Sequence, residues 1–358
     1  MERVSIGCSN TERARAAAAA AAQKAMERGQ MVWVHALPCP VQGGWAVKAH
    51  QAQKGVFLED VGGRLIRHYF DRCGVRQRGP ETRGEEKFST KQSGMVEYIP
   101  LSQEQWARRI VREASFGVHL RRLTVAVEGE GVEQETLRTA LRAAGCRVEP
   151  RWHCGIPAFW MKQGGFVLFG RNERGAAIDS GQLLAVVTLI EMEQGCGQAA
   201  FPAGYSAAAH LVAAGYGKRI LRLDTDGTQA YAAYARLPWL REAPSAAVRI
   251  CRRMMTSGQR LETLLEKTPQ FHIWEREMSC SWERDTIIEA LGEERHIKPE
   301  GEGFCLHVGE CWLHVHPKTR ERAVRVVVEG PDLEASEELC DLYVRRLSGK
   351  ILPHEKNL

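Results

Sequence analysis

Apolar residues along the chain alternate between the spacing of buried strands and that of amphipathic helices. In the first part of the chain, short apolar runs predict strands at residues 4–6, 31–36 and 56–58. The segments between them predict helices at residues 11–28 and 42–53. Asn10 or Thr11 can cap the first helix, and Gly29 can end it. This order of elements predicts a sheet covered by helices.

The third predicted strand leads into a tight reversal. Gly62 and Gly63 are suited to a short hairpin turn, since glycine readily adopts the positive φ angles that such turns require, and residues 65–70 predict a fourth strand. A polar stretch at 73–92 predicts a loop, and Pro100 opens a predicted helix that carries Trp106.

Two further α/β units follow, and the chain then changes character. The second unit begins near residue 123, the third begins near residue 199, and an amphipathic helix is predicted at 248–265. The last part predicts strands at 271–278, 304–308, 311–315 and 324–328, with helices at 283–291 and from Asp332 onward. The predicted fold class is α/β, with three related mixed α/β domains followed by a small α+β domain. The expected domains are residues 1–115, 116–197, 198–268 and 269–358.

Composition excludes several classes of protein. The 358 residues carry 49 Lys+Arg against 44 Asp+Glu, a formal charge of +5 with no concentrated basic segment, so we expect no nucleic-acid partner. No stretch approaches the roughly 18 consecutive apolar residues of a membrane span, and the alanine run at 16–22 lacks the features of a signal peptide. The 11 cysteines form no CxxC pair, which favours reduced thiols and a cytoplasmic location.

Several local strings, in this order of elements, resemble the α-D-phosphohexomutases, the superfamily of phosphomannomutase and phosphoglucomutase. The most specific strings are residues 271–283 and 311–317, the latter running into 325–329, and the helix at 337–344 also fits. Segments 62–70 and 94–100 fit more loosely. The nearest likeness is to the mutase-like module that some bacteria fuse to a mannose-1-phosphate guanylyltransferase domain. The resemblance implies four domains around a central cleft.

Members of that superfamily move a phosphoryl group between the C1 and C6 hydroxyls of a hexose phosphate. The reaction requires a phosphoserine, a carboxylate-bound Mg²⁺, a sugar-binding loop and a cationic phosphate-binding loop. The serine should follow the third strand in a Ser-His-Asn-Pro string, but residues 59–63 contain no Ser, Thr or His. No catalytic residue is therefore identified.

Two more of the four loops depart from the superfamily pattern. The metal loop, Asp-x-Asp-x-Asp-Arg in the superfamily, corresponds to residues 169–174, where Asn172, Glu173 and Arg174 supply a single carboxylate. Mg²⁺ prefers several hard anionic oxygens, so we expect no cofactor unless mutase activity is retained. The sugar loop, Gly-Glu-x-Ser-Gly-His, has no match between residues 224 and 247.

The phosphate loop keeps part of its chemistry in Lys318, Thr319, Arg320 and, on the next strand, Arg325. The resemblance therefore implies a phosphomannomutase-like protein of hexose phosphate metabolism that is catalytically inactive. It would act by binding a phosphosugar, by regulation, or as the partner of a sugar nucleotidyltransferase. The alternative is an active intramolecular phosphotransferase that uses Mg²⁺ and substituted catalytic residues.

A second group of residues is independent of this resemblance. If Gly309 and Glu310 form a two-residue turn, Cys305 lies opposite His314, and alternation places both on one face of the sheet with His307 and His316. Cysteine and histidine are zinc-ligand types. Four ligands spread along two strands seldom converge on one point. A half-exposed polar sheet face is thus the favoured interpretation, and a zinc site is the alternative.

Overall fold

The computed structural model describes residues 2–77, 94–98, 101–201, 206–223, 227–279, 287, 298–300, 303–318 and 323–351. The chain divides into two compact units, each built from two segments of the sequence. The first unit is Met1–Ile178 with Ala235–Leu261, and the second is Asp179–Tyr234 with Glu262–Leu358. The described residues form four sheets, and one sheet falls within each of the four predicted domains. The mixed α/β fold class is confirmed, while the domain boundaries stay a prediction.

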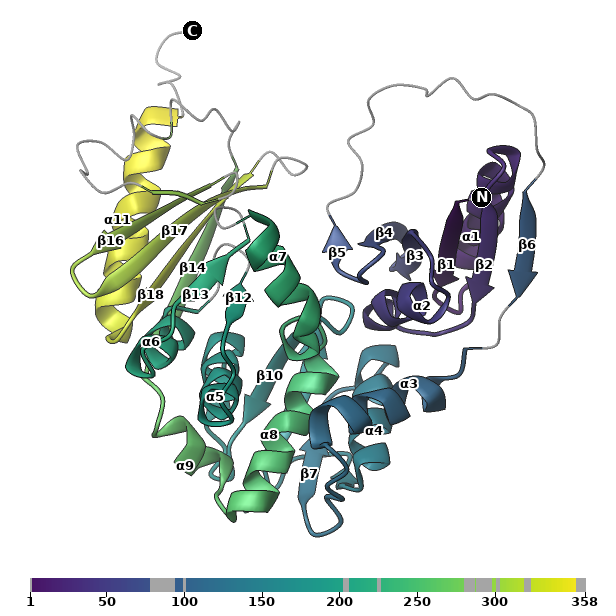
Figure 1. Ribbon diagram of the computed structural model, residues 1–358. Helices are drawn as coiled ribbons and strands as arrows, with labels where there is room; N and C mark the ends of the chain where they lie inside the picture. Colours follow the sequence, from purple (N-terminus) through teal and green to yellow (C-terminus); the bar gives the residue numbers. More distant parts are fainter. Residues whose placement is uncertain are drawn as a thin grey trace, which may run out of the picture. The chain divides into compact units, whose positions relative to one another are not determined.

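The first sheet of the first unit has six strands in the order β5-β4-β3-β1-β2-β6 (Figure 1). Its strands are β1 (Arg3–Cys8), β2 (Met31–His35), β3 (Lys54–Val61), β4 (Arg64–Asp71), β5 (Arg76–Gln77) and β6 (Met95–Tyr98). The connecting helices are α1 (Glu12–Glu27) and α2 (Gly43–Ala49), with a 3-10 turn at Pro40–Gln42 before α2. The Thr11 hydroxyl accepts a hydrogen bond from the Ala14 amide at 3.2 Å, which confirms Thr11 as the cap of α1.

The two helices bury opposite faces of this sheet. Alternate residues of β1 point to opposite sides, so Val4 and Ile6 pack against the buried alanines of α1, including Ala18 and Ala22. The other face packs beneath α2. Its buried cluster is Val47, Ala52, Phe57 and Phe70. The residues of α1 that face the sheet are the buried alanines Ala14, Ala18, Ala22 and Ala25.

The second sheet of this unit has five strands in the order β11-β10-β9-β7-β8. They are β7 (Thr124–Val127), β8 (Arg147–Glu149), β9 (Ala158–Lys162), β10 (Val167–Arg171) and β11 (Ala177–Ile178). In both sheets the first strand lies between two parallel neighbours, and an antiparallel strand follows on the same side. The first two sheets therefore share one plan.

The helices of the first unit include one that continues into a wider turn. Besides α1 and α2, the helices are α3 (Gln103–Ile110), α4 (Val132–Ala144) and α8 (Ala243–Ser257), with a π-helical turn at Val111–Ser115 directly after α3 and a 3-10 turn at Pro238–Leu240. Gly145 has φ +99° at the end of α4, as its position in the sequence suggests.

The second unit contains a two-stranded and a five-stranded sheet. The short parallel pair is β12 (Ala199–Phe201) with β13 (Ile220–Arg222). The accompanying helices are α5 (Ser180–Glu193), α6 (Ala207–Gly215), α7 (Gly227–Arg236) and α9 (Leu261–Leu265). The five-stranded sheet is antiparallel and has the order β14-β18-β17-β16-β15. Its strands are β14 (His272–Ser279), β15 (Lys298–Glu300), β16 (Gly303–Val308), β17 (Cys311–Lys318) and β18 (Ala323–Gly330).

The final helix, α11 (Leu333–Ile351), covers one face of this last sheet (Figure 1). Leu313 and Val326 from the sheet and Tyr343 and Leu347 from the helix belong to one fully buried cluster. The opposite face of the sheet carries the polar residues discussed below.

Some predicted elements differ from the structure. The helix predicted at 248–265 is two helices, because the chain turns at Gly258, where φ is +65°. Strands β5, β6, β8, β9 and β15 were not predicted, and β5 lies within the stretch at 73–92 that predicts a loop. The predicted helix at 283–291 lies outside the described residues except for Ile287. Over the described parts of the chain, no helix combines the length and apolar character that crossing a membrane requires.

Candidate functional site

The third and fourth strands are joined by two residues, at the place where the resemblance predicts a phosphoserine loop. Val61 pairs with Arg64, and between them Gly62 and Gly63 have φ angles of +57° and +81°. The Asp60 carboxylate accepts a hydrogen bond from the Gly63 amide at 3.0 Å, which closes the turn. The expected tight hairpin is confirmed, and the turn itself presents no hydroxyl group.

One serine hydroxyl is hydrogen-bonded to the residues that form this turn. It belongs to Ser9, just beyond the end of β1. Its hydroxyl accepts a hydrogen bond from the Asp60 amide at 3.1 Å. Ser9 is half-buried and follows a parallel strand at its carboxyl end, the edge where ligands bind in α/β sheets. It is therefore the hydroxyl to examine in any test of phosphoryl transfer.

A hydrogen-bonded carboxylate–imidazole pair, which the sequence pattern did not indicate, lies on the inner face of this hairpin. The Glu59 carboxylate and the His68 Nε2 atom are 2.8 Å apart, with side chains 17% and 4% exposed. Glu59 and Asp60 point to opposite faces, as strand alternation requires, so only Glu59 faces inward. The hairpin register could have revealed this pair, because β3 and β4 place Phe57 opposite His68, two residues from Glu59.

A second carboxyl group lies electrostatically close to this pair. Burial raises the pKa of Glu133, at the start of α4, and a hydrogen bond from the Gly164 amide lowers it in part. The charge of Glu59 raises the pKa of Glu133 further. These carboxylates are bound to the protein itself, so they fix the positions of the hairpin and of the β9–β10 turn.

The histidines of the first sheet are also structural. The Ser5 hydroxyl and the His50 Nδ1 atom are 3.0 Å apart, a pair that sequence spacing did not suggest. Both residues are buried, at 1% and 3% exposure, so Ser5 is not accessible as a nucleophile.

The loop that corresponds to the metal loop uses its oxygen atoms internally. The Asn172 side-chain oxygen accepts hydrogen bonds from the amides of Arg174, at 3.0 Å, and Ala176, at 2.9 Å. The Glu173 carboxylate accepts a hydrogen bond from the Leu261 amide at 2.7 Å and is 3% exposed. A buried carboxylate that binds an amide, beside an amide oxygen that shapes the loop, does not fit the ligand set of Mg²⁺.

The interval expected to hold the sugar loop is occupied by helical structure. Residues 227–236 form α7, and the 3-10 turn at Pro238–Leu240 and the start of α8 follow it. Residues 224–226 lie outside the described parts of the chain.

The four predicted phosphate-binding residues are only partly described. Lys318 ends β17 and pairs with Ala323, while Thr319 and Arg320 lie outside the described residues. Arg325 Nε is 3.1 Å from a carboxylate oxygen of Glu275, and its terminal nitrogen contacts the same oxygen. Strand pairing places His316 opposite Arg325, on the sheet face opposite α11, and Lys318 is two residues further along β17.

The proposed zinc residues have the predicted register. Cys305 pairs with His314, and His307 pairs with Trp312. Cys305 and His314 are buried, at 6% and 1% exposure, so the face is more enclosed than the half-exposed surface that the sequence suggested. No group of three or more His, Cys, Asp or Glu side chains, among those that the structure describes, is arranged to hold a metal ion.

Part of this face is covered by α6. The His210 ring stacks on Trp312, with ring centroids 5.7 Å apart, and the Glu329 carboxylate accepts a hydrogen bond from the Ala207 amide. Burial raises the pKa of Glu329, and the nearby His314 lowers it in part. The polar face of the sheet therefore packs against α6, and Glu329 on this face binds the N-terminus of that helix.

Known proteins resemble this chain in structure but not detectably in sequence. The sequence matches no protein-family model and no curated protein. A phosphoglucomutase/phosphomannomutase family protein of Burkholderia thailandensis is similar in structure, with 13% identity, a TM-score of 0.73, and coverage of 99% of this chain and 90% of that one.

Two further solved structures agree. A putative phosphomannomutase of Thermus thermophilus has 14% identity, a TM-score of 0.64, and coverage of 97% of this chain and 89% of that one. The phosphoglucomutase parafusin of Paramecium has 10% identity, a TM-score of 0.63, and coverage of 100% of this chain and 90% of that one. The chain therefore has the fold of the α-D-phosphohexomutase superfamily, the superfamily that its sequence strings resemble.

Proposed function

We propose that this chain is a phosphohexomutase-fold protein that does not transfer phosphoryl groups through a serine and that acts instead by binding a hexose phosphate. The observation that carries the proposal is the two-residue reversal between Val61 and Arg64. A turn this short holds only Gly62 and Gly63, so it cannot present a nucleophile to a substrate. The internal hydrogen bonds of Asn172 and Glu173 support the same conclusion.

A coupled assay tests the loss of activity. The full chain is incubated with glucose 1-phosphate or mannose 1-phosphate, Mg²⁺ and a hexose bisphosphate primer, and formation of the 6-phosphate is followed. We expect no turnover above the blank, while a working phosphoglucomutase in the same assay reacts. Turnover that Ser9→Ala abolishes would instead establish the alternative, an active mutase with a relocated hydroxyl.

The proposed binding site lies in the last sheet, near the start of β18 and the end of β17. Arg325 lies there on β18, beside the strand that ends at Lys318, and its partner is Glu275, a half-exposed carboxylate. A phosphate dianion can replace a carboxylate as the partner of a guanidinium group, because both accept its forked hydrogen bonds.

Thermal shift measurements with hexose phosphates test this site. We expect a rise in melting temperature that Arg325→Ala reduces. Arg276→Ala is the matched control, because Arg276 also pairs with acidic residues and has the same 42% exposure, yet lies on the opposite face. Equal shifts in both variants would show that Arg325 does not bind the ligand. A sugar nucleotidyltransferase partner remains a proposal from the resemblance, which co-purification from the native host can test.

A further inference from the structure

A pocket in the first unit lies between α2 and α3. Its volume is about 340 Å³, large enough for a small organic ligand. The lining residues come from α2, from α3 with its π-helical extension, and from the residue before the cap of α3. They are Trp45, Leu101, Gln105, Arg108, Arg109 and Arg112.

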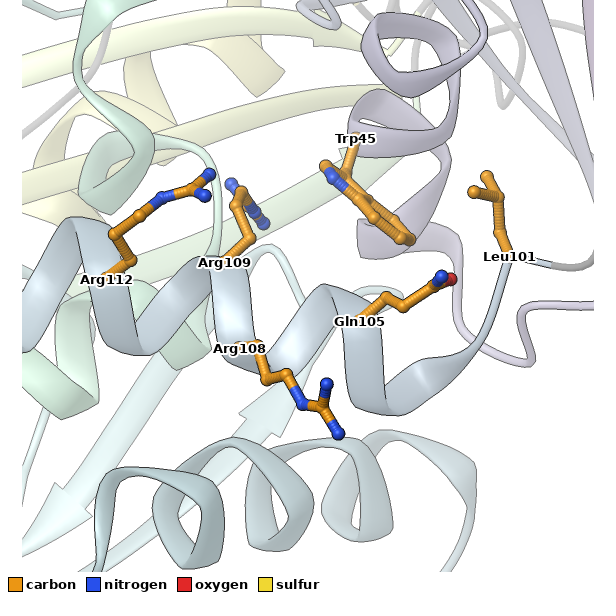
Figure 2. Close-up of a pocket in the computed structure, with 6 residues that line it drawn as sticks. All are labelled: Trp45, Leu101, Gln105, Arg108, Arg109 and Arg112. Carbon is orange, nitrogen blue, oxygen red and sulfur yellow. The ribbon is translucent and has the colours of Figure 1, made fainter.

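The side chains divide the pocket into an apolar part and a cationic part. Figure 2 shows the Trp45 ring between Arg109 and Leu101, with the guanidinium groups of Arg109 and Arg112 next to each other and Arg108 pointing away from Trp45. An indole ring offers a flat apolar surface for a sugar or base ring. The Arg112 guanidinium group offers forked donors for a phosphate, and Arg109 beside it adds positive charge.

Arg109 is held firmly in place. Its Nη1 atom lies 3.0 Å from one oxygen of Glu242 and 3.2 Å from Glu113, and its Nη2 atom contacts the other oxygen of Glu242. The side chain is 10% exposed, and that of Glu242 is 5% exposed. Burial lowers the pKa of Arg109, but the charge and hydrogen bonds of Glu242 and Glu113 outweigh this and raise its pKa overall. Arg109 is therefore a fixed positive charge at the base of the pocket.

Arg112 differs from Arg109 because it is exposed and makes no ion pair or hydrogen bond with any residue in the described parts of the chain. Arg108 is 74% exposed and pairs at 3.3 Å with Glu104, which is 77% exposed. An exposed pair of this kind contributes little to stability, so it competes weakly with a ligand. Arg112 therefore retains its full capacity to bind an anion.

The surrounding charges favour an anion as well. Lys48, on the same helix as Trp45, has Arg241, Arg109, Glu113 and Glu242 as its charged neighbours. Burial lowers the pKa of Lys48, and the charge of Arg241 lowers it further. With Arg112 included, four cationic side chains lie around two carboxylates, and both carboxylates already bind Arg109.

We propose that this pocket binds a phosphate monoester attached to a ring, with the phosphate on Arg112 and Arg109 and the ring on Trp45. The ligand class follows the proposed function, since a hexose phosphate has this chemistry, and a nucleoside monophosphate shares it. The site is distinct from the one around Arg325, so the chain has two separate places for phosphorylated ligands.

Titration calorimetry on the full chain tests the proposal with inorganic phosphate, glucose 6-phosphate, adenosine monophosphate and unphosphorylated glucose. We expect glucose 6-phosphate or adenosine monophosphate to bind more tightly than inorganic phosphate, and glucose not to bind. The tighter of the two identifies the ring.

Single substitutions then assign the site. Arg112→Gln removes a charge-assisted hydrogen bond and is expected to weaken binding about tenfold or more. Trp45→Leu is expected to reduce the preference for the ring-bearing ligand over inorganic phosphate. Arg142→Gln is the control, because Arg142 is a half-exposed, ion-paired arginine on α4 that does not line the pocket.

The outcomes separate the two sites. With two sites we expect two binding events in the full chain, and a binding event that Arg112→Gln weakens and Arg325→Gln leaves unchanged supports this pocket. Binding that depends on Arg325 alone overturns the pocket and leaves the proposed function standing. Absence of binding by all four compounds overturns both ligand assignments, whereas the mutase assay still decides separately whether the chain has activity.

Discussion

At the scale of single residues, the first sheet encloses a titratable side chain that is held neutral. Gly7 pairs with His35 on one side and with Phe57 on the other. A Cβ atom on Gly7 would lie 2.2 Å from Cε1 of His35, so the imidazole occupies the space that the glycine leaves open. Burial lowers the pKa of His35 from 6.5 to about 3, and the nearby His50 adds to this shift.

The His35 pKa predicts a loss of stability in mild acid. A histidine with a lowered pKa stays neutral in the folded chain but is protonated in the unfolded chain below pH 6.5, so protons favour unfolding. Below that pH, the free energy of unfolding should fall by about 1.4 kcal/mol per pH unit from His35 alone, until the pH reaches about 3. Urea denaturation between pH 7.5 and 5 should show a shallower dependence in His35→Gln. The exposed His119→Gln variant should retain the dependence of the natural chain, and an unchanged slope in His35→Gln would contradict the assignment.

At the scale of elements, a turn of two residues joins β3 to β4. The β3–β4 turn depends on two glycines with positive φ, where an L side chain costs about 1–2 kcal/mol. Gly62→Ala and Gly63→Ala should each lower the free energy of unfolding by about this amount in chemical denaturation. Gly197→Ala is the control, since Gly197 has no positive φ and nothing within 4 Å of an added Cβ. Equal effects at all three positions would argue against turn strain.

A second prediction at this scale concerns the contribution of the loop after β10 to stability. Glu173→Ala removes the acceptor of the Leu261 amide and leaves this buried donor without its partner. The free energy of unfolding should fall by about 1–3 kcal/mol. Glu173→Gln keeps an acceptor oxygen and should lose less. If both variants match the natural chain, the carboxylate has no structural role.

The pattern of the sequence predicts elements well where strands are apolar and turns carry glycine. Strands β1 to β4 and the register at Gly62–Gly63 follow from such signals. Strand β8 consists of Arg147, Val148 and Glu149, which is too short and polar to show alternation. The break at Gly258 was missed because the apolar spacing continues on both sides of it.

Features of the candidate sites can be predicted from the sequence only where the residues involved lie close together along the chain. The short hairpin at Gly62–Gly63 and the register of Cys305 with His314 could be inferred from neighbouring residues. The pocket could not, because Trp45 and Arg109 come from helices far apart in the chain and meet only through packing. The Glu59–His68 pair falls between these cases, since a correct hairpin register reveals it.

At the scale of the whole molecule, the fold is that of the phosphohexomutases, while the loop after β10 does not resemble a Mg²⁺ site. We therefore expect the melting temperature of the full chain to be the same with Mg²⁺, with Ca²⁺ and with a chelator, because a cation that binds the folded chain would raise it. A rise that grows with Mg²⁺ concentration and disappears in Glu173→Gln would contradict this prediction.

The turn at Gly62–Gly63 is also a position at which the fold should tolerate the insertion of a longer loop. An added Cβ at Gly62 would meet nothing within 4 Å, and at Gly63 only the end of the Arg13 side chain at 3.7 Å. Neither glycine belongs to the buried clusters on the two faces of the sheet. A segment spliced between these strands would cost mainly chain-closure entropy, about 0.6 kcal/mol for each doubling of its length. The hairpin tip is thus the point at which a catalytic or recognition segment could be grafted while the sheet keeps its packing.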